Sequence, residues 1–301
     1  MILLLGSRSD GPMACVHSAL ERLGVEPAWV DYERPLRSGW LHAAGARLEA
    51  KLVQDDGVEL DLSGVRAAYV RALDHRRFAG YRALDASARA GCDQAHEVLA
   101  CYLDIGEARV LNPAGAMASN RSKPYQISLI RELGFAVPPT LISNQPEAVR
   151  EFLRQHRRVI YKSASAVRSI VRELDAEALD RLDAIRACPV QFQALMEGLD
   201  IRVHVVGSEV FATACTSPVI DYRYAQGESS LSPCVLPEDV SARCVALAQG
   251  LGLPVAGVDL KRHPDGGWTC FEVNPSPGFS WFEHSTGQPI ADAIARLLLA
   301  D

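Results

Sequence analysis

The sequence has no surplus of positive charge and no long apolar run. Its 31 lysines and arginines are outnumbered by 37 aspartates and glutamates, which leaves a net charge of −6. Nucleic-acid-binding proteins usually carry a basic surplus, so this balance argues against a nucleic-acid partner. No stretch approaches the ~18 consecutive apolar residues of a membrane span, and we therefore expect no membrane partner.

The sequence also lacks paired cysteines and the apolar core of a signal peptide. Its eight cysteines are scattered without a CxxC motif, so we expect reduced, mostly buried thiols and neither zinc ligands nor disulfides. The N-terminus, MILLLGSRSD, has only four apolar residues after Met1 and no basic leader, which is too little for a signal peptide. Together these features are typical of a cytoplasmic protein.

The first third of the chain predicts an α/β domain. An apolar strand ends at Gly6, a helical pattern covers residues 11–23, and a second strand covers 28–30. This order of elements predicts a Rossmann-like parallel sheet. The loop GSRSDGP between the first strand and the helix is not GxGxxG, so we predict no dinucleotide site there. The further elements expected in this part are a hairpin over 48–53 and 58–62, a strand over 67–70, a helix over 84–103 and a strand over 108–111.

In the rest of the chain the expected elements follow a different order, with more β-hairpins. The apolar patterns predict helices over 122–133, 146–155 and 241–250, strands over 140–142, 159–162 and 190–195, and a last helix after Pro289. Gly207-Ser208 joins strands 201–206 and 209–214 as a two-residue hairpin, and strands 255–260 and 268–273 form another. We place a domain boundary near residue 112.

The last hairpin carries two carboxylates on one face. If Asp265 and Gly266 form a two-residue turn, Asp259 lies directly opposite Glu272, and Asn274 lies on the same face two residues further. Three hard oxygen donors on one face suit Mg²⁺. The alternatives are a solvated strand face and an acid/base pair for glycoside hydrolysis. The other face supplies a core of Val258, Leu260, Phe271 and Val273.

Several cations stand at the ends of predicted elements. Lys162 ends the strand VIYK, and Lys123 lies at the start of a helix, where a bound anion would offset an unfavourable dipole interaction. Arg202 shares a strand face with Asp200, which predicts either a local ion pair or an arginine aimed at an anionic intermediate. Arg223, in the loop DYRY, is a second arginine of this kind. Solvated surface cations are the alternative for Lys162 and Lys123.

The ordered set of these motifs resembles the ATP-grasp superfamily, and within it the RimK-like carboxylate-amine and peptide ligases. The set is Lys123, VIYK, FQALMEGLDIRVHVVG, AGVDL and CFEVNPSPGF. The likeness covers about residues 110–301. It implies an N-terminal α/β domain over 1–111, the variable Rossmann-like domain that precedes an ATP-grasp fold. A two-lobed α+β ATP-grasp fold follows, with a phosphate-lysine lobe over 112–198 and a metal-site lobe over 199–301.

The resemblance also implies roles for individual residues. Lys123 and Lys162 would contact phosphates, and Arg202 would contact the γ-phosphate and an acyl phosphate. Adenine would be bound by Gln193 and by the backbone of Ala194 and Leu195, and the ribose by Glu197 or Asp200. Two Mg²⁺ ions (or Mn²⁺) would be held by Asp259, Glu272 and Asn274. Two features depart from the family pattern. The loop after Lys162, SASAVRS, lacks the glycines that many relatives use to cover the phosphates, and Ala194 stands where relatives often have an acid.

The function implied is an ATP-dependent, ADP-forming carboxylate-amine ligase that works through an acyl phosphate. Its partners would be a carboxylate substrate (an amino acid, a peptide or another small acid) and an amine acceptor, and relatives suggest a homo-oligomer. The turn NPSPGF would shape the acceptor side. The alternatives are a ligase that cyclises peptide side chains, a small-molecule kinase and a non-catalytic ATP-binding module.

Overall fold

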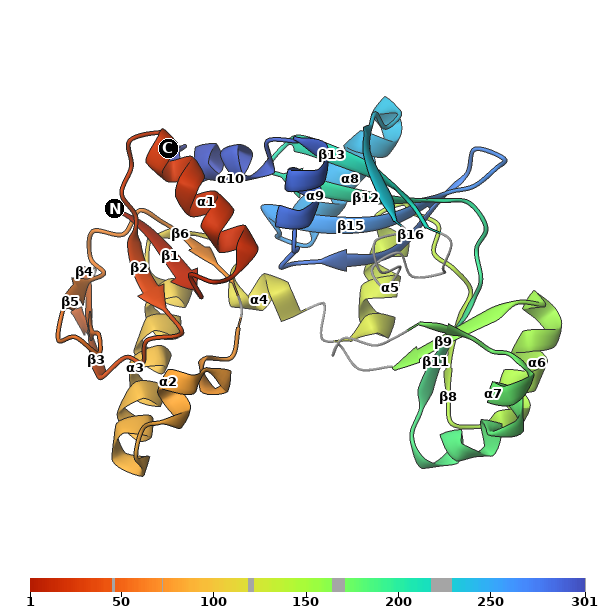
Figure 1. Cartoon of the computed structure of the whole chain (residues 1–301), viewed down its shortest axis with the longest axis horizontal. Coiled ribbons are helices and arrows are strands. Elements are labelled where there is room, and N and C mark those ends of the chain that lie inside the picture. Colours follow the sequence, from red (N-terminus) through yellow and green to blue (C-terminus); the bar gives the residue numbers. More distant parts are fainter. Residues whose placement is uncertain (45–46, 72, 119–121, 164–170, 218–228, 301) are drawn as a thin grey trace. The chain divides into compact units, whose positions relative to one another are not determined.

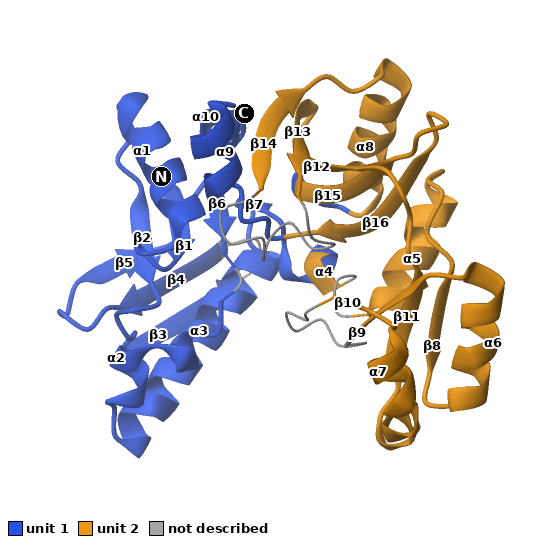
Figure 2. Ribbon diagram, turned by 45° about the vertical axis from the view of Figure 1, so that its right-hand side comes forward, with its two compact units in different colours: residues 1–116, 252–255, 276–301 blue, residues 117–251, 256–275 orange. Residues whose placement is uncertain are grey.

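The fold is described from a computed structural model, in which two compact units can be separated. The structure describes residues 1–44, 47–71, 73–118, 122–163, 171–217 and 229–300. Unit 1 comprises residues 1–116, 252–255 and 276–301, and unit 2 comprises 117–251 and 256–275, as Figure 2 shows in two colours. The chain thus passes repeatedly from one unit to the other. The predicted domain limits near 112 and 199 stay a prediction.

Unit 1 contains a four-stranded parallel sheet, which confirms the α/β class predicted for this part. Its strands are β1 (Ile2–Gly6), β2 (Ala28–Asp31), β6 (Ala67–Val70) and β7 (Arg109–Leu111), in the order β2-β1-β6-β7. Helix α1 (Gly11–Arg22) follows β1, as expected. Because Ile2, Leu3, Leu4 and Leu5 are all buried, the first strand is covered on both faces.

A smaller antiparallel sheet, β3-β4-β5, completes the strands of unit 1 (Figure 1). The hairpin of β4 (Arg47–Val53) and β5 (Glu59–Asp61) was expected, whereas β3 (Ser38–Ala44) was not. Helix α3 (Ala86–Ile105) packs on this sheet through Leu99 and shares a core with Leu52 and Leu3. The remaining elements are η1 (His75–Arg77), α2 (Ala79–Arg82), α4 (Ala114–Met117), α9 (Ser280–Thr286) and α10 (Ile290–Leu299).

Unit 2 contains two sheets. The first has the order β10-β9-β11-β8 and the second β14-β13-β12-β15-β16. The bounds of the strands are β8 (Thr140–Ser143), β9 (Val159–Ser163), β10 (Arg172–Glu173), β11 (Val190–Ala194), β12 (Leu199–Val206), β13 (Glu209–Thr216), β14 (Ser230–Cys234), β15 (Val255–Arg262) and β16 (Trp268–Asn274). The helices are α5 (Lys123–Glu132), α6 (Pro146–His156), α7 (Ala176–Asp180), η3 (Leu182–Ala187) and α8 (Glu238–Gly250). The two-residue turn Gly207-Ser208 is confirmed, because Val206 pairs with Glu209.

The turn between β15 and β16 differs from the prediction. The His263 N–H donates to Gly267 O at 2.9 Å, so three residues form the loop instead of two. Gly266 adopts a φ of 88°, which a side chain would disfavour. The sequence shows that a tight turn lies here, but the glycine that takes the left-handed conformation decides its length.

A β-bulge restores the predicted register further along this hairpin. The register shifts between Asp259 and Leu260, so Leu260 pairs with Cys270 and Asp259 pairs with Glu272. The extra residue, Phe271, is half-buried. Cys270 is fully buried and takes the core position that was expected for Phe271. The predicted core is therefore wrong at Phe271, because a bulged residue leaves the alternation of the strand.

The edge strand β16 is covered by a side chain of α5. Gln126 is 2% exposed; its Nε2 donates to Val273 O at 2.7 Å, and its Oε1 accepts from Val273 N at 3.0 Å. The amide thus satisfies the free backbone groups of Val273 on this edge, while Cys270 N, further along β16, donates to Ala136 O at 2.8 Å. The same contact brings the first residue of α5, Lys123, to the end of the hairpin that carries the carboxylates.

Replacing Gln126 with leucine is expected to destabilise the protein by about 2–3 kcal/mol, because a buried N–H and a buried C=O lose their partners. Urea-induced unfolding of Gln126→Leu and the wild type measures this difference. Ser128→Ala is the matched control: it removes one exposed hydroxyl on the same helix that bonds to Tyr125 O. Equal losses for the two variants would contradict a strand-capping role.

All eight cysteines lie in the described residues, and each is free; four are buried, two are intermediate and two are exposed. Half of them are fully buried, fewer than the sequence led us to expect. None of the helices in the described part of the chain combines the length and apolar character that a membrane span requires.

Candidate functional site

The two carboxylates of the last hairpin face each other as predicted. Asp259 and Glu272 are direct partners in the ladder, and Asn274 pairs with Gly257 at the end of the same strand. The side chains of Asp259 and Glu272 are 25% and 22% exposed, so each keeps some access to solvent. Three oxygen-bearing side chains therefore lie at neighbouring positions of one ribbon, a donor set that suits a hard divalent cation.

Each carboxylate is neutralised by a cation from another element. Arg202 Nη1 on β12 lies 2.7 Å from Asp259 Oδ1. Lys123 Nζ, from the start of α5, forms an ion pair with Glu272 Oε2. Two adjacent carboxylates repel each other, and the two cations offset this repulsion. The structure thus brings Lys123, Arg202, Asp259 and Glu272 together within unit 2, although they are up to 149 residues apart in sequence.

Arg202 is fixed from its other side by a buried histidine. Its Nε donates to His204 Nε2 at 3.4 Å, and Arg202 is only 6% exposed. Burial, with the nearby charge of Arg202, holds the pKa of His204 well below its ordinary value. The imidazole is therefore neutral and accepts this bond. The sequence could have indicated this contact, because residues two positions apart in a strand, such as Arg202 and His204, lie on the same face.

A second ion pair joins the same two strands. Lys261 Nζ on β15 lies 3.0 Å from Asp200 Oδ1 on β12, and the lysine side chain is only 13% exposed. The sequence gave no reason to single out Lys261. The resemblance assigns the carboxylate of Asp200 to a ribose, and this carboxylate is already paired with Lys261.

The other sheet of unit 2 carries a polar face. Lys162 is the ladder partner of Gln191, and Gln193 lies two residues further on the same face, beside Thr140. Gln191 and Gln193 are each 1% exposed, and neither Oε1 atom has a hydrogen-bond partner among the residues that the structure describes. A buried acceptor without a donor costs about 1–3 kcal/mol. A ligand that carries N–H donors would relieve this penalty, and Gln191 was not foreseen.

The connector after β11 is already held by its neighbours. Ala194 N donates to Pro139 O and Leu195 N donates to Arg158 O, each at 3.0 Å. Glu197 is exposed, and its carbonyl lies 2.9 Å from His263 Nδ1. If adenine binds here, the carbonyl groups and the Gln193 amide are the groups left to contact it.

Two predicted features lie outside the described residues. They are the candidate catalytic residue Arg223 and most of the loop SASAVRS, from residue 164 onward. Their roles stay predictions.

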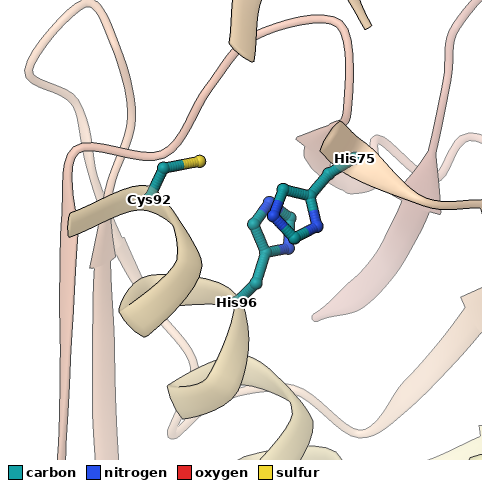
Figure 3. A group of neighbouring side chains, drawn as sticks. All are labelled: His75, Cys92 and His96. Atoms are coloured by element: carbon teal, nitrogen blue, oxygen red, sulfur yellow. The ribbon is translucent and has the colours of Figure 1, made fainter. Parts of the chain in front are cut away.

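A different cluster of metal-ligating residue types lies in unit 1. The ligand atoms of His75, Cys92 and His96 all lie within 4.8 Å of one another (Figure 3). The rings of His75 and His96 are stacked, however, with centroids 3.7 Å apart and planes inclined by 14°. A metal ion lies close to the plane of each imidazole that binds it, and it cannot lie in two stacked planes at once. We therefore interpret this cluster as packing.

This packing makes stability depend on pH. Burial and the neighbouring His75 lower the pKa of His96 to about 3, with Asp93 acting in the opposite direction and Arg76 in the same one. The folded-state pKa of His96 lies below its ordinary value of 6.5, so the unfolded chain binds a proton more readily than the folded protein. The free energy of unfolding is therefore highest above pH 6.5 and falls as pH decreases toward 3. We expect a loss of about 1.4 kcal/mol per pH unit below about pH 6.

Urea unfolding at several pH values between about 6.5 and 5 measures this slope. His96→Phe keeps an aromatic ring against Tyr32 and removes the titrating group. In this variant the free energy of unfolding should depend less steeply on pH, by the equivalent of about one proton, or about 1.4 kcal/mol per pH unit. The same slope in both proteins would show that another group is responsible.

Comparisons with known proteins identify the family of this chain. The model of the RimK-like ATP-grasp domain matches residues 118–298. The probable alpha-L-glutamate ligase of Marinobacter nauticus is 27% identical over 198 residues, which is 61% of this chain and 65% of that protein. The one of Alkalilimnicola ehrlichii is 29% identical over 201 residues, 62% and 66% respectively. The chain thus spans slightly less than two thirds of these relatives.

Solved structures are similar over almost the whole chain. The ATP-grasp ligase PsnB, complexed with minimal precursor, Mg and ADP, is 28% identical with a TM-score of 0.80, covering 99% of this chain and 96% of that one. The macrocyclase MdnB from Microcystis aeruginosa is 25% identical with a TM-score of 0.78, covering 100% and 99%. The macrocyclase MdnC, at 24% identity and a TM-score of 0.82 over 99% of both chains, shares the fold. The predicted ATP-grasp fold is confirmed, and this chain belongs to the RimK-like ATP-grasp family.

Proposed function

We propose that this protein is an ATP-dependent, ADP-forming carboxylate-amine ligase that acts on a peptide. The observation that carries the proposal is the pairing of Asp259 with Glu272, each bound to a cation from a different element. Such an arrangement of alternating charges suits a metal-bound triphosphate, whose own negative charges need both metal ions and cationic side chains. The family match and the solved relatives with ADP, Mg and precursor peptides support it.

The residues present fit the expected metal. Asp259, Glu272 and Asn274 would hold Mg²⁺, with two ions or Mn²⁺ as the finer prediction. Bound Mg²⁺ neutralises the triphosphate and makes its γ-phosphorus easier to attack. Lys123 forms an ion pair with Glu272 before the nucleotide binds. We propose that its ammonium group then turns to the phosphates.

The remaining residues would orient the reactants. Arg202, fixed by Asp259 and His204, presents a positive charge that cannot be lost near neutral pH, and it would stabilise the γ-phosphate and the acyl phosphate. Lys162 would bind phosphate from the polar face of the first sheet of unit 2.

The nucleoside would lie against the same polar face. Gln193, whose Oε1 lacks a partner, would accept from the exocyclic amine of adenine, and the backbone carbonyls of 194–195 would assist. Glu197 or Asp200 would contact the ribose. Arg223 would be a second arginine that contacts the anionic intermediate.

The chemistry follows from these positions. A carboxylate of the peptide attacks the γ-phosphorus, ADP leaves, and an acyl phosphate forms. An amine then attacks the acyl carbon, and phosphate leaves with the loss of one proton. Closure around the intermediate excludes water, which would otherwise hydrolyse it. An acceptor within the same peptide would give a ring, which is the cyclising alternative.

The test is an assay of the purified protein with ATP, Mg²⁺ and a panel of peptides rich in Asp, Glu, Lys, Ser and Thr. We expect peptide-dependent ADP release and a product whose mass is the sum of the joined acid and amine less one water, or that of a single peptide less one water if both groups lie in the same peptide. Hydroxylamine should trap the acyl phosphate as a hydroxamate. A product that gains a phosphoryl group would indicate a kinase instead, and ATP binding without any turnover across the panel would indicate a binding module.

The cytoplasmic location and the homo-oligomer expected from the sequence stay predictions. Sedimentation of the purified protein measures the second, and fractionation of cells measures the first.

A further inference from the structure

One buried arginine in unit 1 ties together two distant loops. Arg71 is 8% exposed and follows β6 directly. Its Nε donates to Asp10 Oδ2 at 2.9 Å, and its Nη1 donates to Ser276 Oγ and to Pro277 O, also at 2.9 Å. A single guanidinium therefore joins the loop after β1 to the turn after β16, although Ser276 is 205 residues from Arg71 in sequence.

The parallel sheet explains why Arg71 reaches both groups. β1 and β6 are parallel neighbours, and Arg71 N donates to Leu5 O at 2.9 Å, so both strands end at the same edge. Asp10 precedes α1 at this edge, and its side chain is 19% exposed. Its charge compensates the buried guanidinium, because a buried charge without an opposite partner carries a large desolvation penalty.

The turn is also held at its other end. Phe279 is fully buried in unit 1, and a Cβ atom on Gly11 would lie 2.6 Å from Ser280 Oγ, which shows how closely α1 and α9 approach. Between these two anchors, a Cβ on Gly278 would meet nothing within 4 Å. The segment from Ser276 to Phe279 is thus fixed at both ends and open in the middle.

This turn begins next to the strand that carries the carboxylates. Asn274 ends β16, and Ser276 follows it after one residue. Two residues of chain span at most about 7 Å, so Arg71 fixes a point within that distance of the proposed metal ligand. We propose that Arg71 is a positioning residue, which holds the 276–279 turn so that the acceptor amine, and not water, reaches the acyl phosphate.

The inference rests on the proposed function and concerns how the intermediate is divided between two reactions. Attack by the amine forms the C–N bond, breaks the acyl C–O bond, and releases phosphate and a proton. Attack by water breaks the same bond and returns the original carboxylate with phosphate. Both consume one ATP for each intermediate, so the ratio of ADP to amide product measures the division. A loss of folded protein lowers both amounts and leaves this ratio unchanged.

The main variant is Arg71→Lys. Lysine keeps the charge beside Asp10, but it cannot reach Asp10, Ser276 and Pro277 together, because it lacks the planar fork of arginine. With the ADP-forming peptide of the panel, we expect the ratio to rise on the order of 3- to 10-fold, since a small displacement of a reactant strongly slows attack. The KM for ATP should stay unchanged.

Two further variants complete the experiment. Ser276→Ala removes one acceptor of Arg71 with little risk to folding, and we expect a smaller rise, about two- to fivefold. Arg109→Met is the matched control: Arg109 also anchors the C-terminal segment of unit 1, at Leu298 O and Ala300 O, but it does not contact the turn. Its ratio should equal that of the wild type.

The outcomes separate this inference from the proposed function. If the wild type joins the peptide with ADP release, and the ratio is unchanged in both Arg71→Lys and Ser276→Ala, the positioning role is wrong while the ligase function stands. If Arg109→Met raises the ratio equally, the effect is general loosening of unit 1, and the role is again wrong. If the wild type forms neither ADP nor amide, both proposals fail. Should Arg71→Lys not fold, the ratio of Ser276→Ala decides alone.

Discussion

Replacing Glu272 with alanine is expected to lower the kcat of peptide-dependent ADP release by about a thousandfold, with little change in stability. The variant loses one of the two carboxylates that would hold the metal, and groups that stabilise developing charge in this way contribute about 10²–10³ in kcat. The Glu272 side chain is 22% exposed, so its removal leaves no large cavity. The Mg²⁺ concentration for half-maximal activity should rise as well.

The matched control for Glu272→Ala lies at the tip of the same hairpin. Asp265 accepts from Gly267 N at 2.9 Å, and asparagine can keep this bond while removing the carboxylate. Asp265→Asn should therefore retain full activity. Unchanged turnover in Glu272→Ala, measured with saturating ATP, would remove the basis of the ligase proposal, because the paired carboxylates carry it.

Replacing Arg202 with methionine is expected to have an effect on catalysis of similar size and a larger effect on stability. Arginines that stabilise a transferred phosphoryl group contribute about 10³–10⁵ in rate. The change also leaves Asp259 without its partner at 2.7 Å, and breaking such a buried pair costs about 3 kcal/mol or more. Hydroxylamine trapping should show that acyl phosphate formation itself is slowed.

Arg202→Lys separates charge from geometry. Lysine can restore a charge near Asp259 but cannot also donate from a guanidinium Nε to His204, so we expect partial recovery of stability and little recovery of rate. Arg181→Gln is the control, since Arg181 forms an exposed pair with Glu177 on a single turn of helix. It should change the free energy of unfolding by less than about 0.5 kcal/mol. Full activity of Arg202→Met would show that this arginine serves folding alone.

The carboxylate pair illustrates how far local sequence patterns reach. The alternation of a strand and the presence of a glycine turn were enough to predict that Asp259 faces Glu272. The turn is longer than predicted, and a bulge at Phe271 compensates for it. The prediction of the pair holds because both deviations change the register by one residue in opposite directions, and only the three-dimensional structure reveals them.

The cations of the site could be predicted as residue types but not as contacts. Lys123 stood out because a cation at the start of a helix is unfavourable without an anion. That its partner is Glu272 depends on Gln126, whose amide attaches the helix to the edge strand. Packing between elements this far apart leaves no periodic signal in either segment. Lys261 and Arg71 were missed for the same reason.

The sequence by itself determined most of the longer elements and their order, the family and the set of oxygen donors, because strand and helix periods and turn residues act over a few positions. The tertiary structure alone decided which charges neutralise each other, that the turn after β16 belongs to unit 1, and that two buried glutamine oxygens have no partner within the described part of the chain. These outcomes depend on burial and on the distances between segments that meet only when the chain folds. Electrostatic and hydrogen-bond energies change most strongly with these two quantities.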